Sequence, residues 1–191
     1  HNILNHKSMP SMRLLWSAGK AAEASNVTAY NCSYTTIKQL KDFSEILYIL
    51  MCGTGAGFSA EDQFTQQLPI IRKKRNEKMP EHVVGDSKDG WANAFNSGLE
   101  AWYDGYDLDM DYSKLRPAGA RLKTMGGRSS GPDAFKMLMA YAKQMVFANQ
   151  GRRLNSLNVH DLVCKTGDIV VVGGVRRSSE ISLSDLDNQL M

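Results

Sequence analysis

The sequence predicts an α/β fold, in which helices and strands alternate along the whole chain. Two observations support this prediction. Segments whose apolar residues recur every three or four positions, as in helices, are separated by short segments whose apolar residues alternate, as in strands. The 191 residues, of which 42% are hydrophobic and 23% charged, are also enough for one domain with a packed core.

The first predicted elements are a loop, a short helix and a strand. We expect residues 9–20 to form a loop because proline, serine and glycine interrupt them, and residues 20–24 to be helical. Residues 29–36 carry Cys32 between two tyrosines at alternate positions. Three such side chains would share one face of a strand.

A longer helix is predicted next, because the apolar residues up to Met51 share one face and Asp42 or Ser44 can cap it. The three glycines of residues 53–57 end it. Their spacing differs from the G-x-G-x-x-G fingerprint of dinucleotide-binding folds, and a helix rather than a strand precedes them. We therefore interpret them as a tight turn into a strand, where another group passes close to the backbone, in preference to a direct phosphate cradle.

The middle of the chain contains a charged run, a helix and a strand. Residues 72–78 (RKKRNEK) are interpreted as a solvated surface segment rather than a nucleic-acid or targeting patch. Asp86 or Ser87 is predicted to begin a helix whose apolar side carries Trp91, Phe95, Leu99 and Trp102. In residues 107–112 aspartates alternate with apolar residues, which predicts a strand with one face in water.

No metal site is predicted. The alternating aspartates of residues 107–111 have the spacing of a calcium loop, but Tyr112 stands where that loop needs glycine and Ala118 where it needs glutamate. His160 and Cys164 lie one helical turn apart and make only two ligands, so we expect a packed core histidine and thiol.

The last third is predicted to contain two helices and a strand. A proline begins a helix expected over residues 133–150. Residues 157–172 have helical spacing in their first half and strand propensity in their second, and we interpret them as a helix that ends at Gly173–Gly174. Residues 178–184 alternate again, as in a strand.

Two glycine-rich loops that carry arginine are candidate anion sites: residues 122–132 (LKTMGGRSSGP) and residues 173–179 (GGVRRSS). Backbone N–H groups freed by glycine, arginine forks and serine hydroxyls suit a phosphate. Each loop alone could be an ordinary surface turn. Their candidate residues are Lys123, Thr124, Arg128, Ser129, Gly173, Gly174, Arg176, Arg177 and Ser178.

Composition narrows the function classes. A net charge of +3 is only mildly basic, which suits small anionic ligands better than nucleic acid. No apolar run approaches the ~18 residues of a membrane-spanning helix. The three cysteines are widely spaced, which argues against a disulfide framework and favours a reducing, cytoplasmic location. Because the first residue is His1 and no structural unit obviously opens there, we expect the chain to be a piece of a longer polypeptide.

Long strings of this sequence resemble the adenosylcobalamin-dependent (class II) ribonucleotide reductases, in particular those that reduce ribonucleoside triphosphates. The strings occur in the order of that family, cover nearly the whole chain and include "LRPAGARLKTMGGRSSGP" and "HDLVCKTGDIVVVGGVRRSSEISLSDL". The matching segments are Met9–Tyr34, Met51–Ser59, Val83–Phe95, Leu115–Pro132 and His160–Leu186.

The resemblance implies that residues 1–191 are the N-terminal half of a catalytic barrel domain, part of a ten-stranded α/β barrel whose missing strands would leave open edges. It implies replacement of the ribose 2′-hydroxyl by hydrogen through a protein thiyl radical and a reducing cysteine pair. The implied cofactor is adenosylcobalamin, with its site and the radical cysteine outside these residues. The implied partners are a ribonucleotide substrate, a deoxynucleoside triphosphate effector and a thioredoxin-like or dithiol reductant.

The resemblance also implies roles for single residues. Cys32 in "YNCSY" matches the first cysteine of the reducing pair. Residues 122–131 resemble specificity loop 1 beside the effector, and residues 173–179 resemble specificity loop 2 between effector and substrate. Arg176 and Arg177 are expected to change position with the effector base. The implied substrate-binding residues are Pro10, Ser11, Asn31, Gly53 and Gly55.

Two alternatives stay open. One is a ribonucleoside-diphosphate reductase of the same superfamily. The other is a non-catalytic nucleotide- or RNA-binding module that uses the two glycine–arginine loops, whose affinity for polynucleotide would fall steeply with salt.

Overall fold

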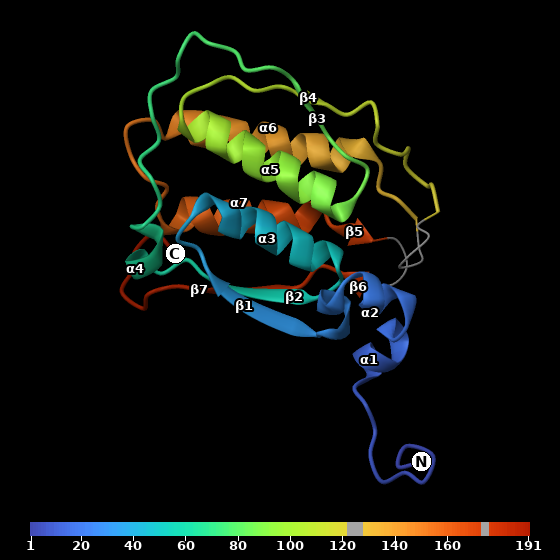
Figure 1. Cartoon of the computed structure of the whole chain (residues 1–191). Helices are drawn as coiled ribbons and strands as arrows, with labels where there is room; N and C mark the ends of the chain where they lie inside the picture. The colour runs from blue at the N-terminus through green and yellow to red at the C-terminus, as the bar shows by residue number, and fades with distance from the viewer. Residues whose placement is uncertain (122–127, 173–175) are drawn as a thin grey trace.

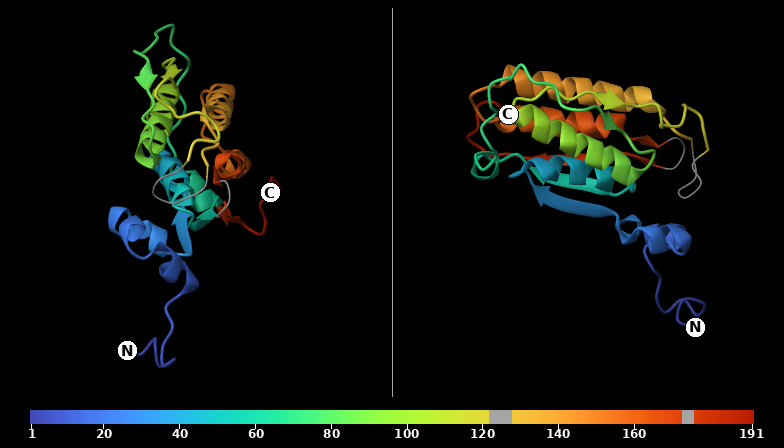
Figure 2. Two further views of the ribbon diagram at one scale, coloured as in Figure 1. Left: turned by 90° about the vertical axis from the view of Figure 1, so that its right-hand side faces the viewer. Right: turned by 45° about the horizontal axis from the view of Figure 1, so that its top comes forward.

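The computed structural model describes residues 1–121, 128–172 and 176–191 (Figure 1). Its main sheet contains three parallel strands in the order β1-β2-β7, which are β1 (Cys32–Thr36), β2 (Gly55–Ser59) and β7 (Glu180–Leu183). Helices lie over one face of this sheet in all three ribbon views (Figures 1 and 2). The predicted α/β class is confirmed.

Four helices form two layers above the sheet. Helices α3 (Leu40–Met51) and α7 (Ser156–Ile169) lie against the strands, and α5 (Lys88–Tyr103) and α6 (Pro132–Ala148) lie outside them (Figure 1). Each helix packs on two of the others, so that α3, α5, α6 and α7 form a closed ring. The apolar faces predicted from the sequence meet inside this ring.

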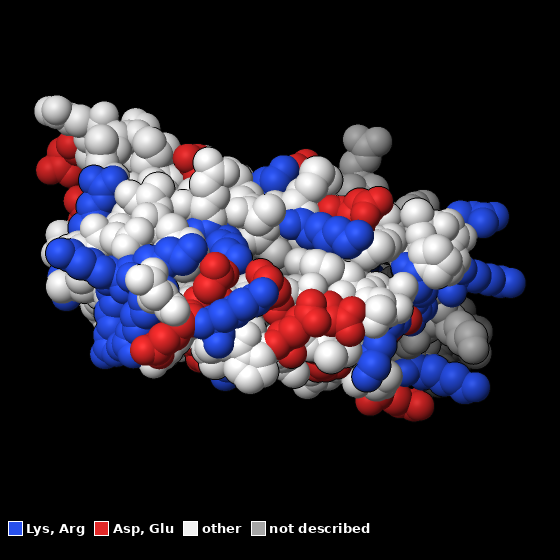
Figure 3. Space-filling view, turned by 90° about the horizontal axis from the view of Figure 1, so that it is seen from above, with Lys and Arg blue, Asp and Glu red and all other residues white. Residues whose placement is uncertain are grey.

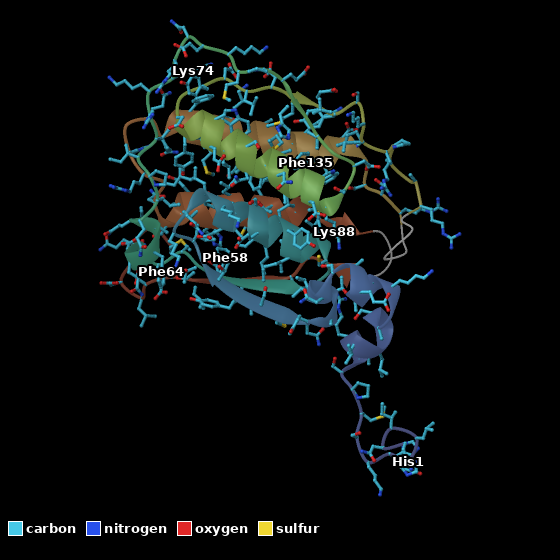
Figure 4. All side chains as sticks on the ribbon, viewed as in Figure 1. His1, Phe58, Phe64, Lys74, Lys88 and Phe135 are labelled. Carbon is cyan, nitrogen blue, oxygen red and sulfur yellow. The ribbon has the colours of Figure 1, made fainter. Side chains whose placement is uncertain are left out.

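Large apolar side chains fill both layers. Phe58 of β2 is fully buried between the sheet and the inner helices, and Phe135 of α6 is fully buried in the outer layer (Figure 4). The ring of Phe135 stacks on that of Trp91 with 4.6 Å between the centroids. The predicted inward residues of α5 and α6 are thus confirmed as core.

The opposite face of the sheet is open. Residues paired across the strands share a face, so Tyr34, Gly57 and Ile181 lie together on this side. The side chains of Tyr34 and Ile181 are 56% and 68% exposed, whereas Phe58 on the other side is fully buried. The sheet therefore has one packed face and one bare face.

The helix starts follow capping rules, with one correction. Ser87 caps α5 by accepting the N–H of Gly90, as predicted. The prediction that Asp42 or Ser44 caps α3 is wrong. Gln39 is the cap, and Asp42 is the third helical residue, whose carboxylate accepts the N–H of Gln39 in a reciprocal capping box.

The predicted continuation of α7 to residue 172 is also wrong. The helix ends at Ile169, and β5 (Val171–Val172) pairs antiparallel with β6 (Arg176–Arg177). Once a partner strand is available, the β-branched valines adopt the strand conformation that their propensity favours. The strand predicted over residues 178–184 is confirmed as β7.

The predicted loop over residues 9–20 contains a helix, so that prediction is wrong. Helix α1 (Met12–Ser17), α2 (Lys20–Ala24) and the 3-10 helix η1 (Asn26–Ala29) pack on one another. Together with the residues around them they form what we call the N-terminal arm, residues 10–30. The arm lies below the end of the helical layers at which β1 begins (Figure 1).

The remaining elements are short. They are α4 (Asp62–Thr65), β3 (His82–Val83) and β4 (Met110–Asp111), of which β3 and β4 pair in parallel. The strand predicted over residues 107–112 is therefore shorter than expected. The charged run is exposed, as predicted, and two of its lysines bind aspartates: Lys74 binds Asp107 at 3.2 Å and Lys78 binds Asp109 at 2.7 Å.

These ion pairs intersperse acidic and basic side chains over the outer face of α5 and α6 (Figure 3). The ammonium groups of Lys143 and Lys74 lower the pKa of the Asp107 carboxyl, and those of Lys78 and Lys143 lower the pKa of the Asp109 carboxyl. Asp107 and Asp109 thus bind lysines, and Asp111 accepts hydrogen bonds from the backbone N–H and hydroxyl of Ser113. In the described part of the chain, no helix combines the length and the apolar character needed to span a membrane.

Candidate functional site

Cys32 is the first residue of β1 and lies at the edge of the bare sheet face. Its register partner is Gly55, the first residue of β2. Gly55 donates its N–H to the carbonyl of Asn31 at 2.9 Å. The Cys32 side chain is exposed and its thiol is free. The neighbouring residue on β2 is a glycine, so no side chain at that position would separate the Cys32 sulfur from a ligand on this face.

The two glycines singled out from the sequence lie where other groups approach the backbone. A Cβ at Gly53 would be 2.7 Å from Nη2 of Arg13, and Gly53 has a positive φ of 76°. A Cβ at Gly55 would be 2.7 Å from Oγ of Ser179. The predicted close approach is confirmed at both positions, and the approaching groups belong to this chain.

Pro10 and Ser11 lie at the start of the N-terminal arm. Ser11 caps α1, and its Oγ accepts the N–H of Leu14 at 3.1 Å. Ser11 is exposed and Pro10 half-buried. The described residues include no hydrogen bond between this turn and Cys32, so the arm's position depends on other contacts.

The first arginine-bearing loop is closed by hydrogen bonds of the residues that flank it. Ser129 exchanges backbone hydrogen bonds of 2.8 Å with Gly119 and Ala120, and Arg128 donates from Nη1 to the carbonyl of Gly119 at 3.1 Å. Arg128 is exposed. Lys123 and Thr124 lie outside the described residues.

The second loop connects β5 to β7. Arg176 and Arg177 form β6, Gly173 and Gly174 lie outside the described residues, and Ser178 donates from Oγ to the carbonyl of Gly167 at 2.6 Å. This last bond occupies a carbonyl at the C-terminal end of α7. The loop is thereby anchored to the helix beneath it.

These segments lie at one end of the molecule. The starts of β1 and β2, the arm, the residues around Arg128 and the β5–β6 hairpin are at the right-hand end of Figure 1 and again in the tilted view of Figure 2. The structure brings Cys32, Asn31, Gly55 and Ser179 into direct neighbourhood.

Glu180 follows this loop and was not singled out from the sequence. It is the first residue of β7, and a Cβ on Gly167 of α7 would overlap its carboxylate. Burial raises the pKa of the Glu180 carboxyl to about 7. No periodic signal marks such a residue, because its environment comes from a helix thirteen positions earlier.

The other two cysteines have separate surroundings. Cys52 is fully buried, and its Sγ accepts a hydrogen bond from Nζ of Lys88 at 3.2 Å, at the arm-facing end of α5 (Figure 4). Cys164 lies 3.5 Å from Nε2 of His160. The expected core burial of Cys164 is wrong, because this side chain is exposed on α7. Within the described residues, no three potential ligands are grouped to hold a metal ion.

No family model matches the chain, but the similar proteins named below share one enzyme name. The adenosylcobalamin-dependent ribonucleoside-triphosphate reductase of Euglena gracilis is 28% identical, over 97% of this chain and 26% of that protein. The enzyme of the same name from Lactobacillus delbrueckii subsp. bulgaricus is 34% identical, over 54% of this chain and 15% of that protein. A probable enzyme of this kind from Dictyostelium discoideum is 25% identical over 99% of this chain.

A solved structure gives the same result for the fold. The crystal structure of a B12-dependent (class II) ribonucleotide reductase superposes with a TM-score of 0.84 and 22% identity, over 98% of this chain and 34% of that one. The chain spans about a quarter to a third of the length of the relatives that it matches along most of its own length. In sequence this chain is similar to the adenosylcobalamin-dependent ribonucleoside-triphosphate reductases, and in fold it is similar to a B12-dependent (class II) ribonucleotide reductase.

Proposed function

We propose that this chain is part of the catalytic subunit of an adenosylcobalamin-dependent ribonucleoside-triphosphate reductase. The observation that carries the proposal is the position of Cys32. Its exposed thiol lies at the edge of a bare sheet face, beside a glycine and at the end of the molecule that holds both arginine-bearing loops. The names of the relatives support the same activity.

In this proposal the three parallel strands are part of a ten-stranded α/β barrel, and residues 1–191 are the N-terminal half of its catalytic domain. The bare sheet face supports this assignment, because the side chains of Tyr34 and Ile181 would be enclosed by further strands. Strands β1 and β7 are the two edges of the present sheet and would each gain a partner.

Cys32 would supply reducing equivalents to the ribose. Its thiol and a second thiol would together give two electrons and two protons, the 2′-hydroxyl would leave as water, and the two sulfurs would form a disulfide. Cys52 is buried against Lys88 and Cys164 lies on a helix of the covered side, so neither is assigned as the second thiol. A dithiol or thioredoxin-like protein would then reduce the disulfide.

Asn31, Pro10 and Ser11 are proposed to bind the substrate, with Ser11 near its phosphates. Gly53 and Gly55 are proposed to leave space for the substrate beside the backbone of this turn, because they carry no side chain. The groups that approach these glycines in the structure are Arg13 and Ser179 of this chain, so the support for this role is the similarity in sequence to the reductases.

The loops around Arg128 and Arg177 are proposed to transmit the identity of a deoxynucleoside triphosphate effector to the substrate site. The proposed residues are Lys123, Thr124, Arg128, Ser129, Gly173, Gly174, Arg176, Arg177 and Ser178. Anchoring of Ser178 to the end of α7 supports this role, since it couples the loop to a rigid helix.

Adenosylcobalamin would supply the radical chemistry when it is bound. Its site is proposed to lie outside residues 1–191, so none of these residues is assigned to hold it. The reaction steps proposed for this chain are therefore limited to substrate binding and reduction.

A cysteine substitution in the full-length reductase tests the proposal. Cys32→Ser should lower turnover of ribonucleoside triphosphates with a dithiol reductant on the order of a thousandfold or more, with substrate affinity unchanged. Cys164→Ser is the matched control, since this cysteine is also exposed, and it should retain full activity. Normal turnover by Cys32→Ser would refute the role of Cys32. Preference of the wild type for diphosphates would replace the triphosphate assignment.

A further inference from the structure

The buried side chains that the structure describes in the N-terminal arm are polar. Among the described side chains before Ile37, the buried ones are Arg13, Ser17 and Thr28. Apolar side chains of α1 face water, with Met12 84% and Leu15 54% exposed. Among the described side chains of this segment, directional hydrogen bonds to carbonyl groups therefore contribute to its placement.

Arg13 makes the bonds that reach furthest along the chain. Its side chain is 7% exposed, its Nε donates to the carbonyl of Thr28 at 2.8 Å, and its Nη2 donates to the carbonyl of Cys52 at 2.7 Å. One guanidinium thus connects α1 to η1 and to the end of α3. The planar fork of arginine can hold two carbonyls in fixed directions, which a lysine ammonium cannot do with the same geometry.

Gly53 provides the space that this guanidinium occupies. Its φ of 76° is one that residues with a Cβ rarely adopt, and a Cβ there would lie 2.7 Å from Nη2 and 3.4 Å from Nη1 of Arg13. The turn between α3 and β2 therefore fits this one side chain. Glycine at position 53 is explained by Arg13 without any contact to a ligand.

The two ends of this connection carry the proposed substrate-binding residues. Ser11 is two residues before Arg13 and caps the helix that Arg13 belongs to. On the other side, Thr54 follows Gly53 and donates from Oγ1 to the carbonyls of Val27 and Tyr30, directly before Asn31 and Cys32. Arg13 and Thr54 together therefore connect the helix that Ser11 caps to the start of β1.

We propose that Arg13 is the positioning residue of the substrate pocket, which fixes the Pro10–Ser11 turn against the start of the sheet by holding the carbonyls of Thr28 and Cys52. This inference rests on the proposed function, because it needs Ser11 to bind substrate. Arg13 itself touches no reacting atom. Strand β1 keeps its pairing with β2 without Arg13, so the chemistry at Cys32 should depend on it less than substrate binding does.

Steady-state kinetics of the full-length reductase test this division. Arg13→Ala should raise the KM for the ribonucleoside triphosphate about tenfold and change kcat by less than about twofold. Arg13→Lys should behave in the same way, because it keeps the charge and loses the fork. Gly53→Ala, which displaces the guanidinium from the other side, should give the same pattern. Lys20→Ala is the matched control, an exposed cation of the same arm, and should leave both constants unchanged.

Several outcomes would overturn the proposal. General damage to the fold would lower kcat through the fraction of active enzyme and leave KM unchanged. An unchanged KM in Arg13→Lys and Gly53→Ala would refute the positioning role, even if Arg13→Ala did not fold. A raised KM in Lys20→Ala would show that any change in the arm has this effect.

Amide hydrogen exchange on the same proteins separates this inference from the proposed function. Arg13→Ala should exchange faster in residues 12–17 and 26–29 and at the wild-type rate in α3. A wild type without ribonucleotide turnover would refute the proposed function, whereas an unchanged exchange rate in the arm would refute the positioning role of Arg13.

Discussion

The helical body and the N-terminal arm are stabilised in opposite ways. In the body, formed by α3, α5, α6 and α7, residues such as Phe43, Phe95 and Phe135 are fully buried against one another. In the arm the buried side chains described are polar, and carbonyl groups are held by Arg13 and Thr54. Apolar packing tolerates small shifts, whereas hydrogen bonds fix directions. The proposed substrate-binding residues Pro10 and Ser11 lie in the arm, where hydrogen bonds fix the directions of the groups that they join.

The largest effect that would test this comparison is expected in the body. Phe135→Ala removes a fully buried ring that stacks on Trp91, and should lower the free energy of unfolding by about 3–5 kcal/mol. Met137→Ala on the same helix is the control, because that side chain is 55% exposed, and should change stability by less than about 0.5 kcal/mol. Urea unfolding of this chain measures both. Equal effects would mean that the helical ring is not the source of stability.

A smaller effect is expected where the body meets the second loop, at Glu180. Its carboxyl pKa of about 7 lies above the ordinary value of 4.5, so folding favours the protonated form. The stability from this group is present below about pH 4.5 and is lost as the pH rises through about 7. Since the carboxyl is partly exposed, the loss should be about 1–2 kcal/mol.

Glu180→Gln isolates this contribution. Urea unfolding at pH 5 and at pH 8 should show the wild type losing more stability than the variant between the two values. A wild type whose stability changes with pH in parallel with Glu180→Gln would show that this carboxyl is not protonated on folding.

The smallest effect is expected for thiol modification, in which the reactivity of the cysteines reports whether the arm covers the body. Cys32 and Cys164 are exposed and should react with a small thiol reagent in the native protein, whereas Cys52, fully buried under the arm, should react only after opening. Mass spectrometry of partly alkylated protein measures the order. Reaction of Cys52 as fast as Cys32 would mean that the arm does not cover the body as described.

Much of the body could be predicted from the sequence because periodicity reports burial directly. The spacing of Phe95, Leu99 and Trp102 predicted the apolar side of α5, and Ser87 its start. The alternation around Cys32 predicted a strand, and the glycines after Met51 a turn with a close approach. These signals are local, since each depends on residues within a few positions of one another.

The secondary-structure predictions were wrong in segments whose conformation depends on residues far away in the sequence. Helix α1 has no buried apolar face among its described side chains, and Arg13 binds the carbonyls of Thr28 and Cys52, which no local pattern encodes. The valines after Ile169 formed a strand because Arg176 and Arg177 return beside them. The resemblance to ribonucleotide reductases indicated residues at the site, but not the Arg13 connection between them.

The sequence by itself determined the α/β class and the helical core, because hydrophobic periodicity and turn residues act over short separations, and its resemblance to ribonucleotide reductases indicated Cys32 as the candidate thiol. Tertiary structure alone decided that Arg13 fills the space over Gly53, that Ser179 approaches Gly55 and that Glu180 is buried beneath Gly167. These contacts join residues far apart in the chain, and their energies depend on direction and desolvation, which exist only after the chain has folded.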